Sequence, residues 1–222
     1  MTDAAPLQDD AVTVEVTQSE TVFEGRVWNL RRDAFVYGDG SIVREYVDHS
    51  GAVAVLALDE EGRALLIRQY RHPVGFREWE IPAGLLDVPG EDPLEAAQRE
   101  LAEEADLTAE RWDVLSDFFT SPGGSDEAIR IYLARGLSVA PETFARTEEE
   151  ADIEVRWVHL DEVVDAVLAR KLQNPSLVIG ALAAAAGRAR DWTSLGAADA
   201  SWPGRSRPVG AESVPGFPSA SP

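Results

Sequence analysis

Seven consecutive apolar residues, Ala52 to Leu58, place the tightest limit on the fold. A run of this kind is typical of a strand buried on both faces, because a half-exposed strand alternates apolar and polar residues. A turn at residues 59–62 and a second strand over 64–70 follow it. Later strands are expected over 114–120, 129–134 and 153–158, with helices over 161–172 and 174–186. This irregular mixture predicts an α/β sandwich around a mixed sheet.

The remaining chain divides around this core. Two strand-like segments flank Gly38-Asp39-Gly40, a hairpin signal, and predict a small N-terminal antiparallel sheet. After residue 190 the composition turns to Gly, Pro, Ser and Ala, which indicates a largely disordered tail unless Trp192 or Trp202 pins it. The predicted segments are a flexible arm (1–12), the N-terminal sheet (13–50), the main α/β domain (51–189) and the tail (190–222).

Charge and composition exclude several classes of partner. With 40 acidic and 20 basic residues the net charge is −20, which repels nucleic acid and anionic lipid. The absence of cysteine is compatible with a reducing cytoplasm, and the first residues do not resemble a signal peptide. No apolar run is long enough to span a membrane. We therefore expect a cytoplasmic protein with neither a nucleic-acid nor a membrane partner.

A helix is expected from Pro93 to about Ala105. Asp92 can act as the N-cap, Pro93 suits the first helical position, and Glu95 completes a capping box. The residues between Arg71 and Gly90 contain several prolines and glycines, and we expect them to be irregular. The helix start is thus clearly marked in the sequence.

Three glutamates share one face of this helix. Glu100, Glu103 and Glu104 lie at positions i, i+3 and i+4, where like charges destabilise one another unless a cation neutralises them. Hard oxygen ligands favour Mg²⁺ or Mn²⁺. By itself, the cluster is better explained as a solvated face in which Arg99 pairs with Glu103, because runs of charge are usually surface.

The loop before the helix decides between these interpretations. Residues 84–107 resemble the Nudix hydrolase box, G-x5-E-x7-R-E-U-x-E-E-x-G-U, in which U is a bulky apolar residue; the matching positions are Gly84, Glu91, Arg99, Glu100, Leu101, Glu103, Glu104 and Leu107. Two positions depart from the pattern. Gly84 lies one residue too far from Glu91, and Asp106 replaces a glycine that would end the helix in a left-handed conformation, which Asp also tolerates.

The resemblance implies a Nudix α/β/α sandwich and assigns roles to the box. Glu100 and Glu104 would be the principal metal ligands, and Glu103 would be a ligand or lie close behind them. The backbone carbonyl of Ala83 or Gly84 would complete the set. Glu91 and Arg99 would pair with each other and tie the loop to the helix.

Residues outside the box resemble the ADP-ribose pyrophosphatase branch of the family. Trp79 to Gly84 matches its approach to the box, and Pro122 lies sixteen residues beyond Asp106, in a loop over 121–127 that includes Ser125. The implied activity is Mg²⁺-dependent hydrolysis of ADP-ribose to AMP and ribose 5-phosphate. A pyrophosphatase for another nucleotide sugar or dinucleotide, and a nucleotide sensor without activity, remain alternatives.

The reaction also needs a base and groups that bind substrate. The resemblance places the base in a loop over residues 147–152, where Glu150 is the first choice, Glu149 the second, and Glu148 a third candidate. Arginine grips phosphate bidentately, so three arginines upstream of the box are candidates: Arg77, which we prefer, then Arg68 and Arg71. Adenine could stack on Trp28, Phe35 or Trp79, although each could instead be core. The N-terminal sheet resembles one that joins a homodimer in this branch.

Overall fold

The computed structural model describes residues 6–141 and 153–205. These residues form two compact units. The N-terminal unit contains residues up to 49 together with 121–126 and 203–205, and the sandwich unit contains the described residues of 50–120 and 127–202. Each unit is described by itself.

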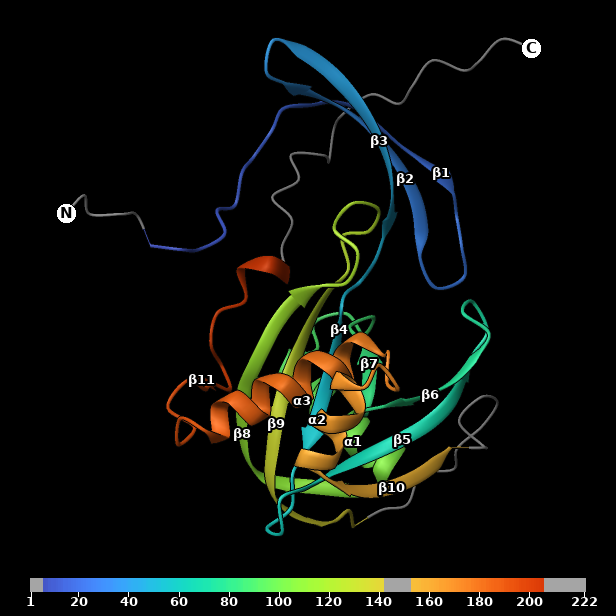
Figure 1. The fold of residues 1–222 in the computed structure, drawn as a ribbon. Coiled ribbons are helices and arrows are strands. Elements are labelled where there is room, and N and C mark those ends of the chain that lie inside the picture. Colours follow the sequence, from blue (N-terminus) through green and yellow to red (C-terminus); the bar gives the residue numbers. More distant parts are fainter. Residues whose placement is uncertain (1–5, 142–152, 206–222) are drawn as a thin grey trace, which may run out of the picture. The chain divides into compact units, whose positions relative to one another are not determined.

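The N-terminal unit is a three-stranded antiparallel sheet in the order β1-β2-β3 (Figure 1). Its strands are β1 (Val16–Phe23), β2 (Asn29–Tyr37) and β3 (Gly40–Asp48). Only two residues separate β2 from β3, and Tyr37 pairs directly with Gly40. The first of the two, Gly38, takes the left-handed conformation that this tight turn requires (φ 60°). The loop over 121–126 binds the end of β3, where the Val47 amide donates to the Gly124 carbonyl at 2.9 Å.

The sandwich unit contains the remaining strands and all three α-helices of the described residues. Five strands form one sheet in the order β11-β8-β9-β4-β7, and three form another in the order β10-β5-β6. β4 pairs with β9 in parallel and with β7 antiparallel, so the first sheet is mixed, as predicted. The elements are β4 (Ala52–Ala57), β5 (Arg63–Arg71), β6 (Phe76–Glu80), β7 (Ala83–Leu85), α1 (Pro93–Ala105), β8 (Leu107–Phe119), β9 (Ala128–Val139), β10 (Glu154–His159), α2 (Leu160–Leu168), α3 (Pro175–Arg188) and β11 (Gly196–Ala197).

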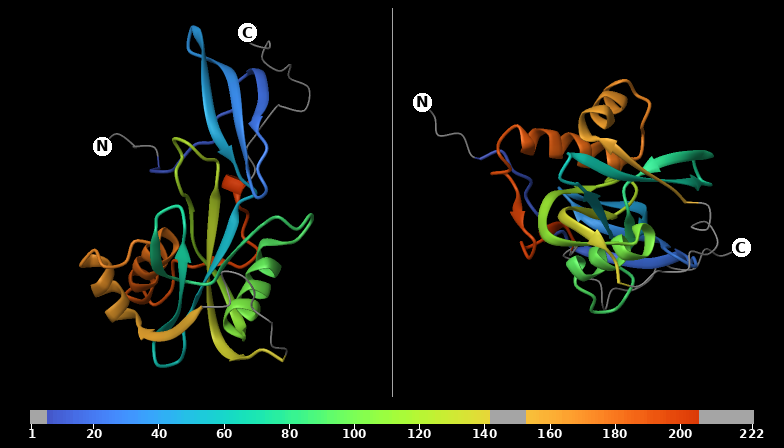
Figure 2. Two further views of the ribbon diagram at one scale, coloured as in Figure 1. Left: turned by 90° about the vertical axis from the view of Figure 1, so that its right-hand side faces the viewer. Right: turned by 90° about the horizontal axis from the view of Figure 1, so that it is seen from below.

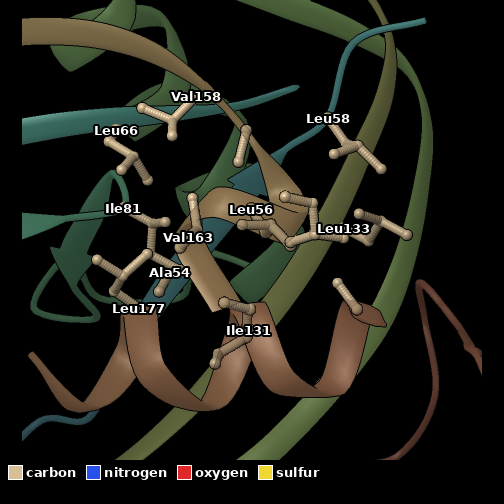
Figure 3. Close-up of a cluster of buried hydrophobic side chains, with 14 of the residues drawn as sticks. Ala54, Leu56, Leu58, Leu66, Ile81, Ile131, Leu133, Val158, Val163 and Leu177 are labelled. Carbon is tan, nitrogen blue, oxygen red and sulfur yellow. The ribbon is translucent and has the colours of Figure 1, made fainter. Parts of the chain in front are cut away.

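β4 separates two hydrophobic cores, which confirms the predicted α/β/α sandwich. Its residues are completely or almost completely buried, and they alternate between the cores. Ala54 and Leu56 pack with Leu177 of α3 (Figure 3), whereas Val53 and Val55 pack with Leu101 of α1. The view from below in Figure 2 shows α1 (green) on one side of the strands and α2 and α3 (orange) on the other.

Two short strands occupy a segment that the sequence predicted to be irregular. β6 pairs antiparallel with β5, and β7 pairs with β4. Both are held by pairing with other strands, β6 in a hairpin with β5 and β7 beside β4, and the prolines and glycines around them hid this pairing from the sequence. Together they carry the chain from the β5–β6 hairpin to the start of the box.

The predicted disordered tail is wrong for residues 190–202. Trp192 packs against the core beneath α3, and β11 pairs with β8. Trp202 packs against the core beneath α1, under the guanidinium of Arg130 at 4.9 Å from the ring centroid. The two tryptophans therefore pin this segment, and residues 203–205 form the 3-10 turn η2 (Pro203–Arg205). We call residues 190–202 the C-terminal strap.

Arg130 of β9 joins this strap to the sheet. Its side chain is 3% exposed and donates two hydrogen bonds of 2.8 Å to the carboxylate of Asp117 on β8. It also donates to the backbone carbonyls of Ala200 at 2.6 Å and Ser201 at 3.1 Å. One buried cation therefore links two strands and the strap.

Within residues 6–141 and 153–205, no helix combines the length and apolar character needed to cross a lipid bilayer.

Candidate active site

α1 is fixed at both ends by local interactions. At its start, the Asp92 side chain accepts from the Leu94 amide at 2.9 Å, and Glu95 closes the capping box. At its end, Asp106 takes the left-handed conformation (φ 55°, ψ 35°), and its amide donates to the carbonyl of Ala102. Aspartate thus replaces the expected glycine without extending the helix.

An ion pair attaches the preceding loop to α1. Arg99 donates from Nε to Glu91 Oε1 at 3.0 Å and from Nη2 to Oε2 at 3.1 Å, which is a bidentate contact. These hydrogen bonds lower the pKa of Glu91 and raise the pKa of Arg99. Arg99 also donates from Nη1 to Glu100 at 2.6 Å and to Glu103 at 3.1 Å. Arg99 therefore organises three carboxylates of the box.

Glu104 is held differently from the other two glutamates. It is only 5% exposed, and its Oε2 accepts from the Ala83 amide of β7 at 3.0 Å. This contact joins the last turn of α1 to the strand that begins the box. The helix carboxylates and the β7 backbone thus lie together in the sandwich unit.

Gly84 makes room for the Glu100 carboxylate. A Cβ at residue 84 would fall 1.9 Å from Glu100 Oε1 and 2.0 Å from its Cδ, far inside van der Waals contact. Any side chain here would displace the carboxylate from its place beside β7. The glycine of the box is therefore required by the close approach of a carboxylate, and the extra residue in the loop does not remove that approach.

The donor set fits a hard divalent cation. Carboxylates and a backbone carbonyl are the ligands that Mg²⁺ and Mn²⁺ prefer. In the described part of the chain, no three Asp, Glu or His side chains form a ready-made metal-binding group. The contacts of Arg99 account for this in part, because Arg99 draws Glu100 and Glu103 toward itself while Glu104 faces the Ala83 amide. Glu100, Glu103, Glu104 and the Ala83 carbonyl are the residues that could hold the ion.

The two faces of the β5–β6 hairpin separate the three candidate arginines. On β5, Leu65 and Ile67 face the core beneath α1, whereas Ala64 and Leu66 face the core beneath α2 and α3. Because strand residues alternate, Arg71 falls on the α1 face. Arg68 and Arg77 fall on the opposite face; Arg77 lies across from Tyr70. The geometry favours Arg71 over Arg77.

On the α1 face, Arg71 pairs with a carboxylate that the sequence did not single out. Its Nε donates to Glu80 Oε1 at 2.8 Å, and its Nη2 donates to Oε2 at 2.7 Å. Glu78 lies on the same face, opposite Gln69. Burial raises the pKa of Glu78, and the charge of Glu80 raises it further. Sequence reasoning missed Glu80, because the residues between Arg71 and Gly90 were expected to be irregular. The signal in the sequence was the place of Glu80 within the segment Trp79 to Gly84 that leads into the box.

On the far face, Arg68 and Trp79 contact each other. The guanidinium of Arg68 lies 5.5 Å from the Trp79 ring centroid and pairs with Glu154 of β10 at 3.5 Å. Trp79 also packs against the core beneath α3. Trp79 therefore has a packing role, the alternative left open for it by the sequence.

The other candidates fall outside this group. Pro122 and Ser125 belong to the N-terminal unit, where Ser125 bridges to Val47, and Trp28 and Phe35 belong to the same unit. The candidate bases Glu148, Glu149 and Glu150 lie outside the described residues.

Comparison with known proteins identifies the family. Residues 48–177 match the model of the NUDIX domain. The chain belongs to the NUDIX domain family. The match covers more than half of the chain and includes all of the box, α1 and β5–β7. Members of this family generally depend on a divalent metal, which agrees with the donor set.

The chain is also similar to individual proteins. The chain is 45% identical to an ADP-ribose pyrophosphatase of Mycobacterium tuberculosis over 170 residues, covering 76% of this chain and 82% of that protein. It is 38% identical to a methanol dehydrogenase activator of Bacillus methanolicus over 163 residues, covering 73% and 87%. The crystal structure of an ADP compounds hydrolase matches with a TM-score of 0.68 at 20% identity, over 83% of this chain and 100% of that one. The structural match supports the fold.

Proposed function

We propose that this NUDIX protein hydrolyses the pyrophosphate bond of ADP-ribose to AMP and ribose 5-phosphate, with Mg²⁺ as the cation and Mn²⁺ as a substitute. The observation that carries the proposal is that two carboxylates of α1 lie against β7: Gly84 leaves room for Glu100, and the Ala83 amide donates to Glu104. A sensor that only binds nucleotide has no need for three like charges that destabilise a helix. The similarity to the mycobacterial ADP-ribose pyrophosphatase supports the choice of substrate.

Each residue has a separate task in this mechanism. Glu100 and Glu104 hold the cation together with the Ala83 carbonyl, and Glu103 is a ligand or supports them. When bound, the cation supplies Lewis-acid stabilisation of charge on the diphosphate. Arg71, on the α1 face, binds phosphate oxygens. Glu150, or Glu149 in second place, is the base that deprotonates the attacking water.

Turnover of a panel tests the reaction class and the substrate together. The protein is incubated with Mg²⁺ and ADP-ribose, other nucleotide sugars or dinucleotides, and the products are separated by chromatography. ADP-ribose should have the highest kcat/KM and should yield AMP and ribose 5-phosphate. Absence of turnover on every member would favour a sensor, and faster turnover of another member would change the substrate.

Glu104→Gln tests the metal assignment. Loss of one ligand charge should lower kcat by at least about 100-fold. Substitution of residues that only hydrogen-bond a metal ligand already lowers metal affinity or activity by roughly 10–100-fold. Glu95→Gln is the matched control on the same helix, because glutamine also completes a capping box. Unchanged kcat in Glu104→Gln would remove Glu104 from the ligand set.

The choice of base has its own test. Glu149→Gln and Glu150→Gln are compared, and the true base should show a large loss of kcat with little change in KM. Equal, small effects in both variants would exclude both residues.

We also propose a homodimer joined through the N-terminal unit. The N-terminal sheet has three strands, and Phe23, Val36 and Val43 are exposed on one face of it, where a second copy could cover them. Light scattering on the intact protein should give twice the chain mass of 24.1 kDa, and Val36→Glu with Val43→Glu should lower it. The lack of cysteine supports a cytoplasmic location.

A further inference from the structure

The Arg71–Glu80 ion pair combines a buried anion with an accessible cation. The side chain of Glu80 is 3% exposed, whereas that of Arg71 is 40% exposed. Both carboxylate oxygens accept hydrogen bonds, at 2.8 and 2.7 Å, so the guanidinium plane is fixed relative to the carboxylate. A single contact would leave the guanidinium able to swing, and the double contact prevents that.

Stability alone does not account for this arrangement. Removing a carboxylate from water costs several kcal/mol, and a well-packed apolar pair often serves the fold as well or better. Glu80 lies directly across from Ile67, which is fully buried beneath α1, so an apolar side chain would fit the same surroundings. We therefore look for a role beyond stability, and holding one side chain in a single conformation is a role that buried ionic groups have in some proteins.

The position of the pair indicates what is being oriented. Arg71 is the last residue of β5, on the α1 face of the hairpin. Glu80 ends β6, three residues before Ala83, whose amide binds Glu104. The carboxylate that fixes Arg71 is thus built into the same chain segment as the start of the metal site.

We propose that Glu80 is a positioning residue that holds the Arg71 guanidinium in the orientation that binds the substrate diphosphate. The proposal rests on the proposed function, because it assigns Arg71 to the phosphates of ADP-ribose. Glu80 itself does not contact substrate. It removes the conformational freedom that a partly exposed arginine would otherwise lose on binding, which is the gain expected from preorganisation.

A double-mutant cycle separates positioning from general support of the fold. The variants are Glu80→Gln, Arg71→Lys and the double variant, and KM and kcat for ADP-ribose are measured on each. Glu80→Gln should raise KM on the order of tenfold with kcat within about threefold, because an interaction common to ground and transition states is weakened. In the Arg71→Lys background, Glu80→Gln should change KM by less than about twofold.

A second ion pair on β5 supplies the matched control. Arg63 pairs with Asp59 at 2.7 Å, its side chain is also 40% exposed, and it lies at the opposite end of the strand from Arg71. Asp59→Asn should leave KM within twofold of the wild-type value. A rise in KM in this control equal to that in Glu80→Gln would show that general loosening of β5 explains both, and would overturn the proposal.

A binding measurement keeps this test distinct from that of the proposed function. Calorimetry with α,β-methylene ADP-ribose, which cannot be hydrolysed at the bridging position, gives Kd without turnover. Kd should weaken about tenfold in Glu80→Gln, parallel to KM. Unchanged Kd and KM in Glu80→Gln, or equal effects in both Arg71 backgrounds, would overturn positioning. Failure of the wild-type protein to bind the analogue or to cleave ADP-ribose would instead overturn the proposed function.

Discussion

Arg71 and Arg130 form bidentate ion pairs in the same unit, with opposite burial. At Arg130 the cation is 3% exposed and its partner Asp117 is 34% exposed. At Arg71 the cation is 40% exposed and its partner Glu80 is 3% exposed. A buried guanidinium needs acceptors for its other donors, and backbone carbonyls of the strap provide them. Burying the carboxylate instead leaves the arginine accessible to a ligand. Which member of the ion pair is buried thus distinguishes the two arginines. Arg130 stabilises the fold, and Arg71 can contact a ligand.

The largest expected effect lies at the buried cation. Arg130→Met removes the Asp117 contact and leaves the carbonyls of Ala200 and Ser201 without this donor. The free energy of unfolding should fall by about 3 kcal/mol, which is the lower end of the cost of removing one partner from a buried ion pair. The lower end applies because the remaining partner, Asp117, is partly exposed to water. Urea unfolding followed by tryptophan fluorescence measures it.

The KM of the same Arg130→Met variant distinguishes the role of Arg130 from that of Arg71. In the folded fraction of Arg130→Met, KM for ADP-ribose should stay within about twofold of the wild-type value. A large change in KM with little loss of stability would contradict the structural role of Arg130 and remove the contrast.

A smaller effect on stability is expected at the buried anion. Glu80→Gln should change the free energy of unfolding by less than about 1 kcal/mol, because an amide is easier to bury and Arg71 remains hydrated. Denaturation in urea at pH 7.5 measures this difference. A loss as large as that of Arg130→Met would make the Arg71–Glu80 pair primarily structural.

The smallest effect should depend on pH and lies at Glu78. Burial and the charge of Glu80 raise the pKa of Glu78 above its usual value of 4.5. The folded state then binds more protons than the unfolded state above pH 4.5, so this group costs stability as the pH rises through its folded pKa. Glu78→Gln should therefore gain roughly 0.5 kcal/mol or less at pH 7.5 and nothing near pH 4, since water still reaches the half-buried carboxylate. Equal gains at both pH values would exclude an electrostatic origin.

How much could be predicted from the sequence depends on how local each interaction is. The bounds of α1 follow from Asp92, Pro93 and Glu95 within one turn, and its end follows from Asp106, so both were predicted. The apolar run of β4 likewise predicted a strand between two layers. These features are encoded in neighbouring residues.

Features that depend on pairing with another segment were missed. β6 is held by its hairpin pairing with β5, and the five residues 76–80 are too few to mark a strand by themselves. Choosing Arg71 over Arg77 required the register of that pairing, since a shift of one residue would exchange the two faces. The order of the C-terminal strap comes from Arg130, 70 residues before Ala200, whereas the Gly, Pro, Ser and Ala content of residues 190–222 as a whole indicated disorder.

The strap also affects when the fold can be completed during synthesis. A chain leaves the ribosome from its N-terminus at about 5–20 residues per second, so β9 emerges well before residues 200 and 201. Until those residues follow, Arg130 lacks two of its acceptors, and the edge of β8 lacks β11. The sandwich therefore reaches its final packing only after the strap has been translated. A chain truncated at Ala189 would keep the active-site segments but would lack the strap contacts with Arg130 and the pairing of β11 with β8.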